Sequence, residues 1–376
     1  MPWNEVSAMS LRREFVMLAC IEGANVSALC RRFGVSRKTG YKWLARTRLD
    51  EETALADRSR RPGRSPARTA PAIEALILSL RAKHPAWGAR KLRARLQAKG
   101  HRGLPAVSTI TEILRRHGLL DRERSANQAP PQRFERARPN ELWQMDFKGH
   151  FPIDSGRCHA LGVLDDHSRY NLCLKACKDE RRQTVKSALT ETFRRYGLPE
   201  QMLMDHGPPW GYDPEHPYTR LAVWLLRLGI DVLHGRPRHP QTQGKEERFH
   251  RTLHVELLQS RRFTDLRATQ QAFDQWRECY NLERPHESLS MQPPISRYRP
   301  SPRPFPEQLP ALEYAETDTR CRVDQNGEIR FARRCIEVTR ALRGERIAVR
   351  ALNVDGRFGV YYGAVKLREI DLQEGK

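Results

Sequence analysis

Three acidic residues stand where predicted elements of secondary structure begin or end, and their type suits chemistry on phosphates. Asp146 lies in an alternating stretch at 142–151, Asp205 ends an apolar run, and Glu247 lies in the first turn of a predicted helix. Carboxylates supplied by distant parts of one chain are how a protein holds two Mg²⁺ ions for phosphoryl transfer. Glycoside hydrolysis would need only two such acids.

Two adjacent glutamates begin that helix, and its periodicity separates them. Apolar residues recur at every fourth position, namely Phe249, Leu253 and Leu257. Glu246 projects among these residues, whereas Glu247 shares another face with Arg251 and His254. We therefore assign the metal-facing role to Glu247. The alternative is that both glutamates only complement the helix dipole.

The stretch 142–151 has the alternation of a strand. Its apolar side is predicted to hold Trp143, Met145, Phe147 and Phe151. Its polar side is predicted to hold Gln144, Asp146, Lys148 and His150. Asp146 is thus expected on the polar face of the strand.

Composition indicates a polyanionic partner. The chain has 376 residues, enough for two to four domains, and its 67 Lys and Arg against 45 Asp and Glu give a net charge of +22. No apolar run approaches a membrane span, and the N-terminus lacks a signal-peptide pattern. The eight cysteines form no Cys-x-x-Cys pair, so we expect them to be reduced. These features favour a cytoplasmic protein bound to DNA.

Residues 10–45 are predicted to form three short helices in the order of a helix-turn-helix, with Ser36 as the N-cap of the third. The third helix should pack through Tyr41 and Leu44. Its exposed residues, expected to enter a major groove, are Arg37, Lys38, Thr39 and Lys42. The alternative is a generic three-helix bundle with a solvated basic face.

A basic, proline-containing linker follows at 57–69. Its Arg60, Arg61 and Arg64 either track phosphates or a minor groove, or are simply solvated. Residues 71–120 then repeat the pattern of three short helices, which predicts a second helix-turn-helix module. Two modules in tandem would read a longer DNA site than one. The alternative role of the second module is to hold protein partners.

The central region predicts strands first and then alternating helices and strands. Three strands form a meander through a turn at 165–168, where Asp165 and Asp166 are more consistent with a turn than with extra metal ligands. His286 is interpreted as structural, because two-metal chemistry needs no general base. After a proline-rich connector, short apolar runs between glycine turns predict a small C-terminal β-barrel.

The motifs WQMDF, MDHG, HPQTQGKEERFHRTL and YNLERPHESL, in this order, resemble the integrase-type core of bacterial insertion-sequence transposases. The resemblance covers roughly residues 140–298. It implies a ribonuclease-H-like fold, and Asp146, Asp205 and Glu247 as the catalytic and metal-binding triad. It also places Gly244, Lys245 and Arg248 near DNA, and we add Arg251 to that set. The second motif departs from the more usual Ser-Asp-Asn-Gly, since Met204 and His206 flank Asp205.

The resulting fold prediction is a multidomain α/β protein with tandem helix-turn-helix modules, a ribonuclease-H-like catalytic core with a mixed sheet, and a small C-terminal β-barrel. The predicted DNA-binding domains are 1–56 and 70–120, and the catalytic domain is 140–300. Linkers are predicted at 57–69, 121–139 and 301–316, and the barrel at 317–376.

The functional hypothesis is a DNA transposase that binds terminal inverted repeats, cleaves the ends and joins the 3′-hydroxyls to target DNA. We expect two Mg²⁺ ions per site, with Mn²⁺ as a substitute. The expected partners are double-stranded DNA and further copies of the chain, at least a dimer on paired ends, in the bacterial cytoplasm at the nucleoid. The alternatives are a catalytically inactive transposase-derived regulator and a metal-dependent nuclease without joining activity.

Overall fold

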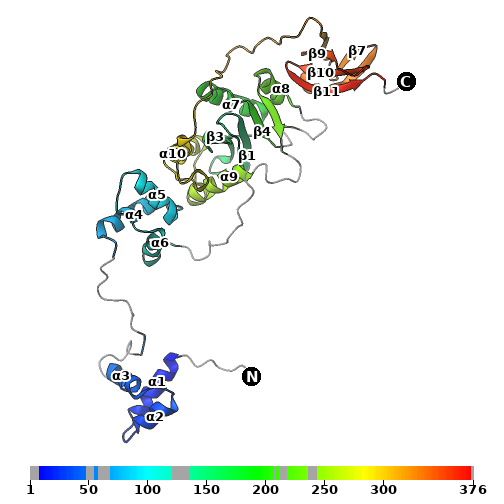
Figure 1. Ribbon diagram of the computed structural model, residues 1–376. Helices are drawn as coiled ribbons and strands as arrows, with labels where there is room; N and C mark the ends of the chain where they lie inside the picture. Colours follow the sequence, from blue (N-terminus) through cyan, green and yellow to red (C-terminus); the bar gives the residue numbers. More distant parts are fainter. Residues whose placement is uncertain are drawn as a thin grey trace. The chain divides into compact units, whose positions relative to one another are not determined.

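The computed structural model describes residues 8–47, 55–57, 68–120, 135–205, 209–211, 218–235 and 244–373. The chain divides into two compact units, Met1–Arg68 and Thr69–Lys376 (Figure 1). Each unit is described by itself below. Among the described residues, no helix combines the length and the apolar character that crossing a membrane requires.

The first unit contains three helices, α1 (Ala8–Ala19), α2 (Val26–Arg32) and α3 (Arg37–Thr47). Their core holds Phe15, Val16, Cys30 and Trp43. Ser36 directly precedes α3, and its Oγ accepts a hydrogen bond from the Thr39 backbone N–H at 3.1 Å, which confirms the predicted N-cap. The helices meet at Gly40, where a Cβ atom would lie 2.5 Å from the Cys30 sulfur.

The second unit begins with another set of three helices, α4 (Pro71–Lys83), α5 (Ala89–Ala98) and α6 (Val107–Arg116). Their amphipathic stripes bury a separate core that includes Ile77, Trp87, Leu92 and Ile110. This helical part contacts the following domain through α5, because Arg95 forms an ion pair of 2.8 Å with Glu283.

The centre of the second unit is a five-stranded sheet in the order β3-β2-β1-β4-β5. The strands are β1 (Leu142–Ile153), β2 (Gly156–Asp165), β3 (Asn171–Cys177), β4 (Gln201–Met204) and β5 (Asp231–His234). Strands β1 to β3 pair antiparallel as the predicted meander, and β4 and β5 add in parallel on the other side of β1. The result is a mixed sheet, as predicted for a ribonuclease-H-like core.

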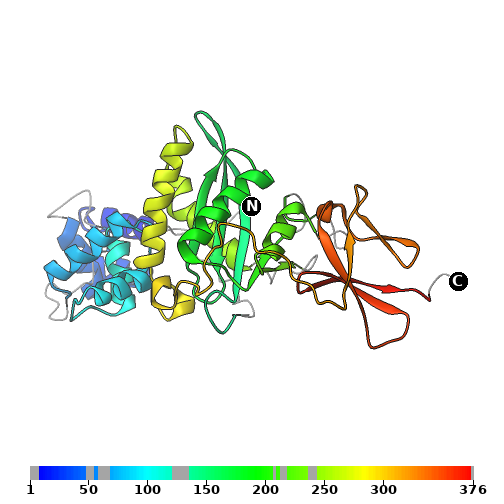
Figure 2. The ribbon, with the colours of Figure 1, turned by 90° about the horizontal axis from the view of Figure 1, so that it is seen from above.

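Helices cover both faces of this sheet (Figures 1 and 2). One face packs on α7 (Arg182–Tyr196) and α8 (Arg220–Arg227), through a cluster that includes Trp143, Leu161 and Phe193. The other face packs on α9 (Gly244–Glu256) and α10 (Leu266–Leu282), through a cluster that includes Cys158, Phe249 and Phe273. Short 3₁₀ helices follow at Leu258–Ser260, Glu287–Leu289 and Pro294–Ser296.

The alternation predicted for β1 is correct only for its first half. Trp143, Met145 and Phe147 share one cluster, but Phe151 packs in the cluster on the opposite face, so its predicted side is wrong. The reason is a β-bulge, because the register with β2 shifts between Phe147 and His150. An extra residue in one strand reverses the side-chain direction beyond it.

The C-terminal part contains two sheets. One has the order β11-β10-β9-β6 and the other pairs β7 with β8. The strands are β6 (Thr319–Arg322), β7 (Glu328–Phe331), β8 (Arg334–Glu337), β9 (Arg346–Ala351), β10 (Arg357–Tyr362) and β11 (Val365–Asp371), with a 3₁₀ helix at Arg340–Leu342. Predicted glycine turns have positive φ at Gly327, Gly344 and Gly356. Among the described residues the sheets are not closed into a ring, so the predicted barrel is not confirmed.

Candidate active site

Asp146 lies on β1 opposite Gly162 of β2, on the sheet face that α9 covers. Burial raises the pKa of Asp146 to about 7, and a backbone hydrogen bond from Phe147 opposes the shift. The negative charges of Asp205, Glu180 and Glu247 raise this pKa further. The sheet and α9 therefore bring all three predicted acids into electrostatic contact.

Helix α9 gives its two adjacent glutamates opposite environments, as its periodicity predicted. Glu246 is buried at 1% exposure, whereas Glu247 is exposed. Among the described residues, the two carboxylate oxygens of Glu246 have no hydrogen-bond partner, and burial raises the pKa of Glu246 well above the usual range. Glu247 thus faces solvent beside Asp146, and Glu246 faces the sheet.

The helix approaches the sheet closely because β2 has no side chain at Gly162. A Cβ atom there would lie 3.4 Å from Glu246 Oε2, His250 Nε2 and Phe249 Cε1. This contact holds the first turns of α9 against the strand pair that carries Asp146. The register of the helix, and with it the direction of Glu247, is set by this packing.

His250 lies beside Asp146, which the sequence alone did not indicate. Its Nδ1 is 3.8 Å from Asp146 Oδ2, and its Nε2 is 3.7 Å from Glu246 Oε2. Burial, and to a lesser extent the charge of Lys148, lowers the pKa of His250 to about 4. The imidazole is therefore neutral near pH 7 and forms no ion pair with either acid.

Asp205 directly follows β4, the strand that pairs with β1 through Gln144 and Leu203. Its backbone carbonyl accepts a hydrogen bond of 3.1 Å from Nδ1 of His234, at the end of β5. His206, the unusual neighbour of Asp205 in the sequence, lies outside the described residues.

Glu180 is a fourth acid of this site that the sequence analysis missed. Its charge acts on Asp146, and its Oε1 contacts His159 Nδ1 at 2.8 Å. It follows β3 without a motif of its own, so only the pairing of β1, β2 and β3 reveals it. Among the described residues, the triad acids do not form a group whose ligand atoms all lie within 4.8 Å of one another.

One group elsewhere has ligand atoms that all lie within 4.8 Å of one another, namely His84, Cys279 and Glu283. It lies where the helical part of the second unit meets α10. The Glu283 carboxylate already pairs with Arg95 at 2.8 Å, and Trp87 stacks on the His84 ring at 3.8 Å. A guanidinium in contact with a potential ligand disfavours a cation there, so the group is better explained as a docking contact.

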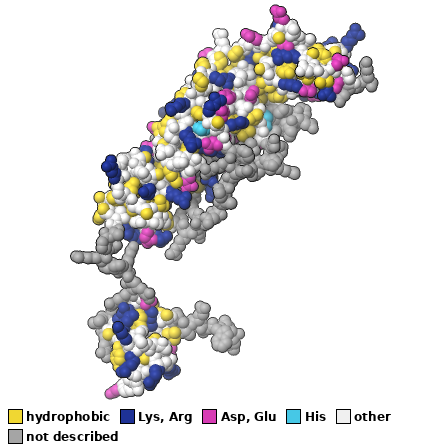
Figure 3. Space-filling view, viewed as in Figure 1, with side chains coloured by type: hydrophobic (Ala, Val, Ile, Leu, Met, Phe, Trp, Pro, Cys, Tyr) yellow, Lys and Arg dark blue, Asp and Glu magenta, His cyan; other side chains and the backbone are white. Residues whose placement is uncertain are grey.

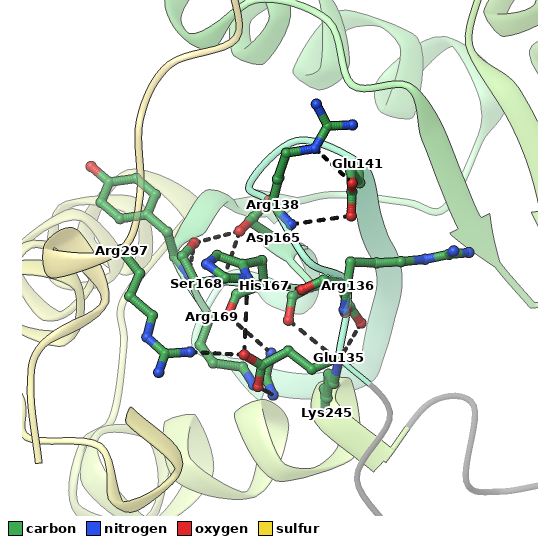
Figure 4. Close-up of polar contacts among 12 residues, drawn as sticks. Glu135, Arg136, Arg138, Glu141, Asp165, His167, Ser168, Arg169, Lys245 and Arg297 are labelled. Carbon is green, nitrogen blue, oxygen red and sulfur yellow. Dashed lines mark hydrogen bonds and ion pairs between the residues drawn. The ribbon is translucent and has the colours of Figure 1, made fainter. Parts of the chain in front are cut away.

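The Asp165–Arg169 turn is built from hydrogen bonds, as its interpretation as a turn requires (Figure 4). Asp165 accepts the backbone N–H groups of Asn140 and Ser168, each at 2.7 Å, and the Ser168 hydroxyl. Asp166 accepts the Arg136 backbone N–H at 2.8 Å and Gln144 Nε2 at 2.7 Å. Both oxygens of each carboxylate are therefore occupied by protein donors.

The predicted DNA contacts differ in exposure. On α3, Arg37, Lys38 and Lys42 are exposed, while Thr39 is half-buried with its hydroxyl on Ser36 at 2.9 Å. Tyr41 is 52% exposed, so its predicted packing role is wrong, and Gly40 and Trp43 are buried instead. Arg60, Arg61 and Arg64 lie outside the described residues.

On α9, Arg248 and Arg251 are exposed. Lys245 is not, because its side chain is only 18% exposed and its Nζ pairs with the Asp166 carboxylate. Lysine and arginine side chains are spread over the visible surfaces of both units (Figure 3). The positive charge is therefore not confined to one of the two units.

His286 has the environment of a structural residue. It is 8% exposed, and burial followed by the charges of Arg284, Lys91 and Arg169 lowers its pKa well below the usual range. Arg284 Nη1 lies 3.3 Å from its Nε2.

The chain matches several protein families. Residues 136–240 and 228–294 each match an integrase core domain, and residues 318–376 match the C-terminal domain of IS481 family transposases. Residues 12–63 match a helix-turn-helix domain and residues 39–114 a homeodomain-like domain. These matches define a protein with helix-turn-helix modules and an integrase core of the ribonuclease-H-like fold.

Similar proteins come from insertion elements. The IS476 uncharacterized 39.2 kDa protein of Xanthomonas euvesicatoria is 26% identical over 69% of this chain and 75% of its own length. The IS407 uncharacterized 31.7 kDa protein of Burkholderia multivorans is 25% identical over 59% of this chain and 79% of its own length. Together with the domain matches, these relatives support the interpretation of the chain as a bacterial insertion-sequence transposase.

Solved structures with some similarity are of retroviral integrases. A chain of the simian T-cell lymphotropic virus intasome, in complex with PP2A regulatory subunit B56 gamma, has a TM-score of 0.38 and 16% identity, covering 78% of this chain and 99% of that chain. The HTLV-2 integrase catalytic core domain in complex with magnesium has a TM-score of 0.33 and 17% identity, covering 43% of this chain and 99% of that chain. The similarity to insertion-sequence transposases rests on the sequence matches.

Proposed function

We propose that this chain binds the terminal inverted repeats of its element, cleaves the ends and joins the 3′-hydroxyls to target DNA. The observation that supports the chemistry is the acidic site on the integrase core. Asp205, Glu180 and Glu247 all raise the pKa of Asp146 through their charge. A divalent cation among these carboxylates would relieve that repulsion, and oxygen ligands are those that Mg²⁺ prefers.

Asp146, Asp205 and Glu247 are the residues that would hold the ions, two per site, with Mn²⁺ as a substitute. Bound ions would activate the attacking water or 3′-hydroxyl and stabilise the leaving oxygen. Glu247 projects from α9 toward solvent, where a DNA strand can reach it, because Glu246 and Phe249 fix the opposite face of the helix on the sheet. Exposed Arg248 and Arg251 on the same helix would neutralise phosphates.

The modules around the core would supply recognition. We assign end binding to 1–56 and 70–120, with Arg37, Lys38, Thr39 and Lys42 as contacts, and catalysis to 140–300. Arg60, Arg61 and Arg64 of the linker between the two modules would add further contacts. Linkers would lie at 57–69, 121–139 and 301–316, and a small barrel at 317–376. Two ends must be joined together, so we propose at least a dimer on paired ends, acting on DNA in the bacterial nucleoid.

The decisive experiment uses the full chain, Mg²⁺ and a pre-nicked duplex of the terminal repeat, with joined products resolved on a denaturing gel. Wild type is expected to join, and Asp205→Asn and Glu247→Gln are expected not to. Glu246→Gln is the matched control, because it changes the neighbouring glutamate on the buried face.

Each of the other outcomes of this experiment would support a different function or a different assignment of the site residues. Cleavage without joining would indicate a nuclease. Specific binding to the end without cleavage or joining would indicate the transposase-derived regulator. Loss of joining in Glu246→Gln but not in Glu247→Gln would reverse the assignment of the two glutamates.

A further inference from the structure

We propose that Asp166 is a positioning residue that sets the spacing between the strand carrying Asp146 and the helix carrying Glu247. This inference rests on the proposed function of those two acids. Asp166 lies in the turn after β2 and is only 4% exposed. It is outside the proposed ion-binding triad, yet its carboxylate contacts both elements that position the triad.

The first contact is to β1. Gln144 Nε2 donates to Asp166 Oδ1 at 2.7 Å, and Gln144 lies two residues before Asp146 on the same face of the strand. The Asp166 backbone N–H also donates to the carbonyl of Leu142, the first residue of β1, at 2.9 Å. Gln144 is 3% exposed, and its Oε1 has no hydrogen-bond partner in the part of the chain that the structure describes. Asp166 therefore provides the hydrogen bond that orients this side chain.

The second contact is to α9. Lys245 Nζ pairs with Asp166 Oδ1 and lies 3.3 Å from the Asp166 backbone carbonyl. Lys245 lies two residues before Glu247, at the start of the helix. Its side chain is 18% exposed and that of Asp166 is 5% exposed, so the pair is largely shielded from water. One carboxylate oxygen thus joins the residue two positions before Asp146 to the residue two positions before Glu247.

Asp166 is not suited to be a metal ligand itself. Its Oδ2 accepts the Arg136 backbone N–H at 2.8 Å, and its Oδ1 faces both an amide and an ammonium group. An ion would have to displace a lysine. Asparagine at this position has no charge to pair with Lys245, and its N–H₂ group would face either the Arg136 N–H or the donors of Gln144 and Lys245, so Asp166→Asn weakens the link while keeping the size of the side chain.

The test measures Mg²⁺ binding to the full chain by titration calorimetry, and the Mg²⁺ concentration for half-maximal joining of the pre-nicked end. Changes behind the ligands of a metal site typically cost about 10- to 100-fold in metal affinity or activity. Asp166→Asn is expected to raise both Mg²⁺ midpoints by about that factor. Its affinity for end DNA, measured by fluorescence anisotropy without metal, should stay within about twofold, because the affected residues are buried.

Two further variants distinguish a positioning role of Asp166 from a general effect on the stability of the fold. Gln144→Leu removes the strand contact together with a buried unpaired oxygen, so it should keep the melting temperature and still raise both midpoints. Glu135→Gln is the matched control, because Glu135 pairs with Arg169 and Arg297 beside the same turn (Figure 4). Among the described residues it forms no hydrogen bond or ion pair with β1 or α9, and only its charge acts on Lys245. It should keep the wild-type midpoints.

The inference is overturned if Asp166→Asn and Gln144→Leu keep the wild-type Mg²⁺ midpoints, whatever their melting temperatures. It is also overturned if Glu135→Gln shifts the midpoints equally, since the effect would then belong to the whole turn. A wild-type protein that neither binds Mg²⁺ nor joins DNA would instead refute the proposed function.

Discussion

The Nδ1 atom of His250 lies 3.8 Å from a carboxylate oxygen of Asp146. The same ring lies 3.7 Å from Glu246, yet its Nε2 and both Glu246 oxygens lack a hydrogen-bond partner within the described ranges. On the side opposite the exposed Glu247, α9 therefore turns two buried polar side chains with few hydrogen bonds, Glu246 and His250, toward the sheet. Three stability predictions concern this helix and its neighbours, and a fourth concerns the first unit.

Asp146 makes the stability of the metal-free protein depend on pH. Its pKa is raised from 3.8 to about 7, so between these values the unfolded chain releases a proton that the folded protein retains. The unfolded state then binds fewer protons, and the free energy of unfolding falls as pH rises through this window. Above about pH 7 the contribution of Asp146 is constant.

Urea unfolding of wild type and Asp146→Asn, in a chelator from about pH 5 to about pH 8, measures this effect. The variant should gain stability relative to wild type up to about pH 7 and keep a constant advantage above it. The contributions of other titrating groups largely cancel in the difference between the two free energies of unfolding. A difference that does not depend on pH would contradict the raised pKa of Asp146.

Glu246→Leu is expected to stabilise the metal-free protein. The carboxyl is buried with both oxygens unpaired, and leaving a buried polar group unsatisfied costs about 1–3 kcal/mol. Leucine extends the apolar stripe of Phe249 and Leu253. Thermal unfolding should show a higher melting temperature, and the matched exposed variant Glu247→Leu should change it little. A decrease for Glu246→Leu would mean that the carboxyl has a partner in solution.

Glu256→Gln is expected to destabilise the core by about 3–5 kcal/mol, because it leaves a buried charge without its partner. Arg284 pairs with Glu256 at 2.8 Å, and their side chains are 8% and 10% exposed. The pair joins the end of α9 to the residues after α10. Chemical denaturation checks this value.

The control for that variant is Glu307→Gln. Glu307 pairs with Arg194 at 2.6 Å, but the two side chains are 64% and 55% exposed. Solvent screening makes such a pair weak, so the melting temperature should hardly change although the contact is shorter. Equal effects of the two variants would show that burial does not determine the strength of these pairs.

Gly40→Ala should destabilise the first unit. Alanine is favoured over glycine in a helix by about 1 kcal/mol, but a Cβ here would lie 2.5 Å from the Cys30 sulfur and 2.8 Å from Phe15 Cζ. Overpacking a core costs about 1–3 kcal/mol, so the steric effect should dominate. Circular dichroism melting of the full chain should show an earlier first transition, and affinity for end DNA should fall. A first transition at higher temperature would mean that α1 and α2 shift to make room for the Cβ atom without loss of stability.

Local patterns predicted the elements around the site because each pattern depends on neighbours in sequence. The stripe of Phe249 and Leu253 gave the direction of Glu247, and Ser36 gave the start of α3. The failures depend on pairing across the fold. Phe151 changes face at a bulge defined by β2, and Tyr41 is exposed because Gly40 and Trp43 form the contact with other helices.

Contacts that form only on folding also limited the prediction of the site. Asp146, Asp205 and Glu247 could be proposed from motifs, and their catalytic role stays a prediction. Glu180 and His250 come near Asp146 only through the sheet register and the crossing of α9. No local pattern marks Asp166 as the partner of Lys245, because the two residues lie in different elements and meet only after folding.

Gly162 shows how a site can be constrained by a residue that contributes no side chain to it. Any side chain larger than a methyl group would press on side chains of α9, because atoms of Glu246, Phe249 and His250 already lie 3.4 Å from the position of a Cβ. The choice of amino acid on β2 is therefore restricted by a helix far along the chain. A bulky substitution there would act on the helix that carries Glu247 while every acid of the site remained in the sequence, so counting intact acids is not sufficient to judge whether a relative is active.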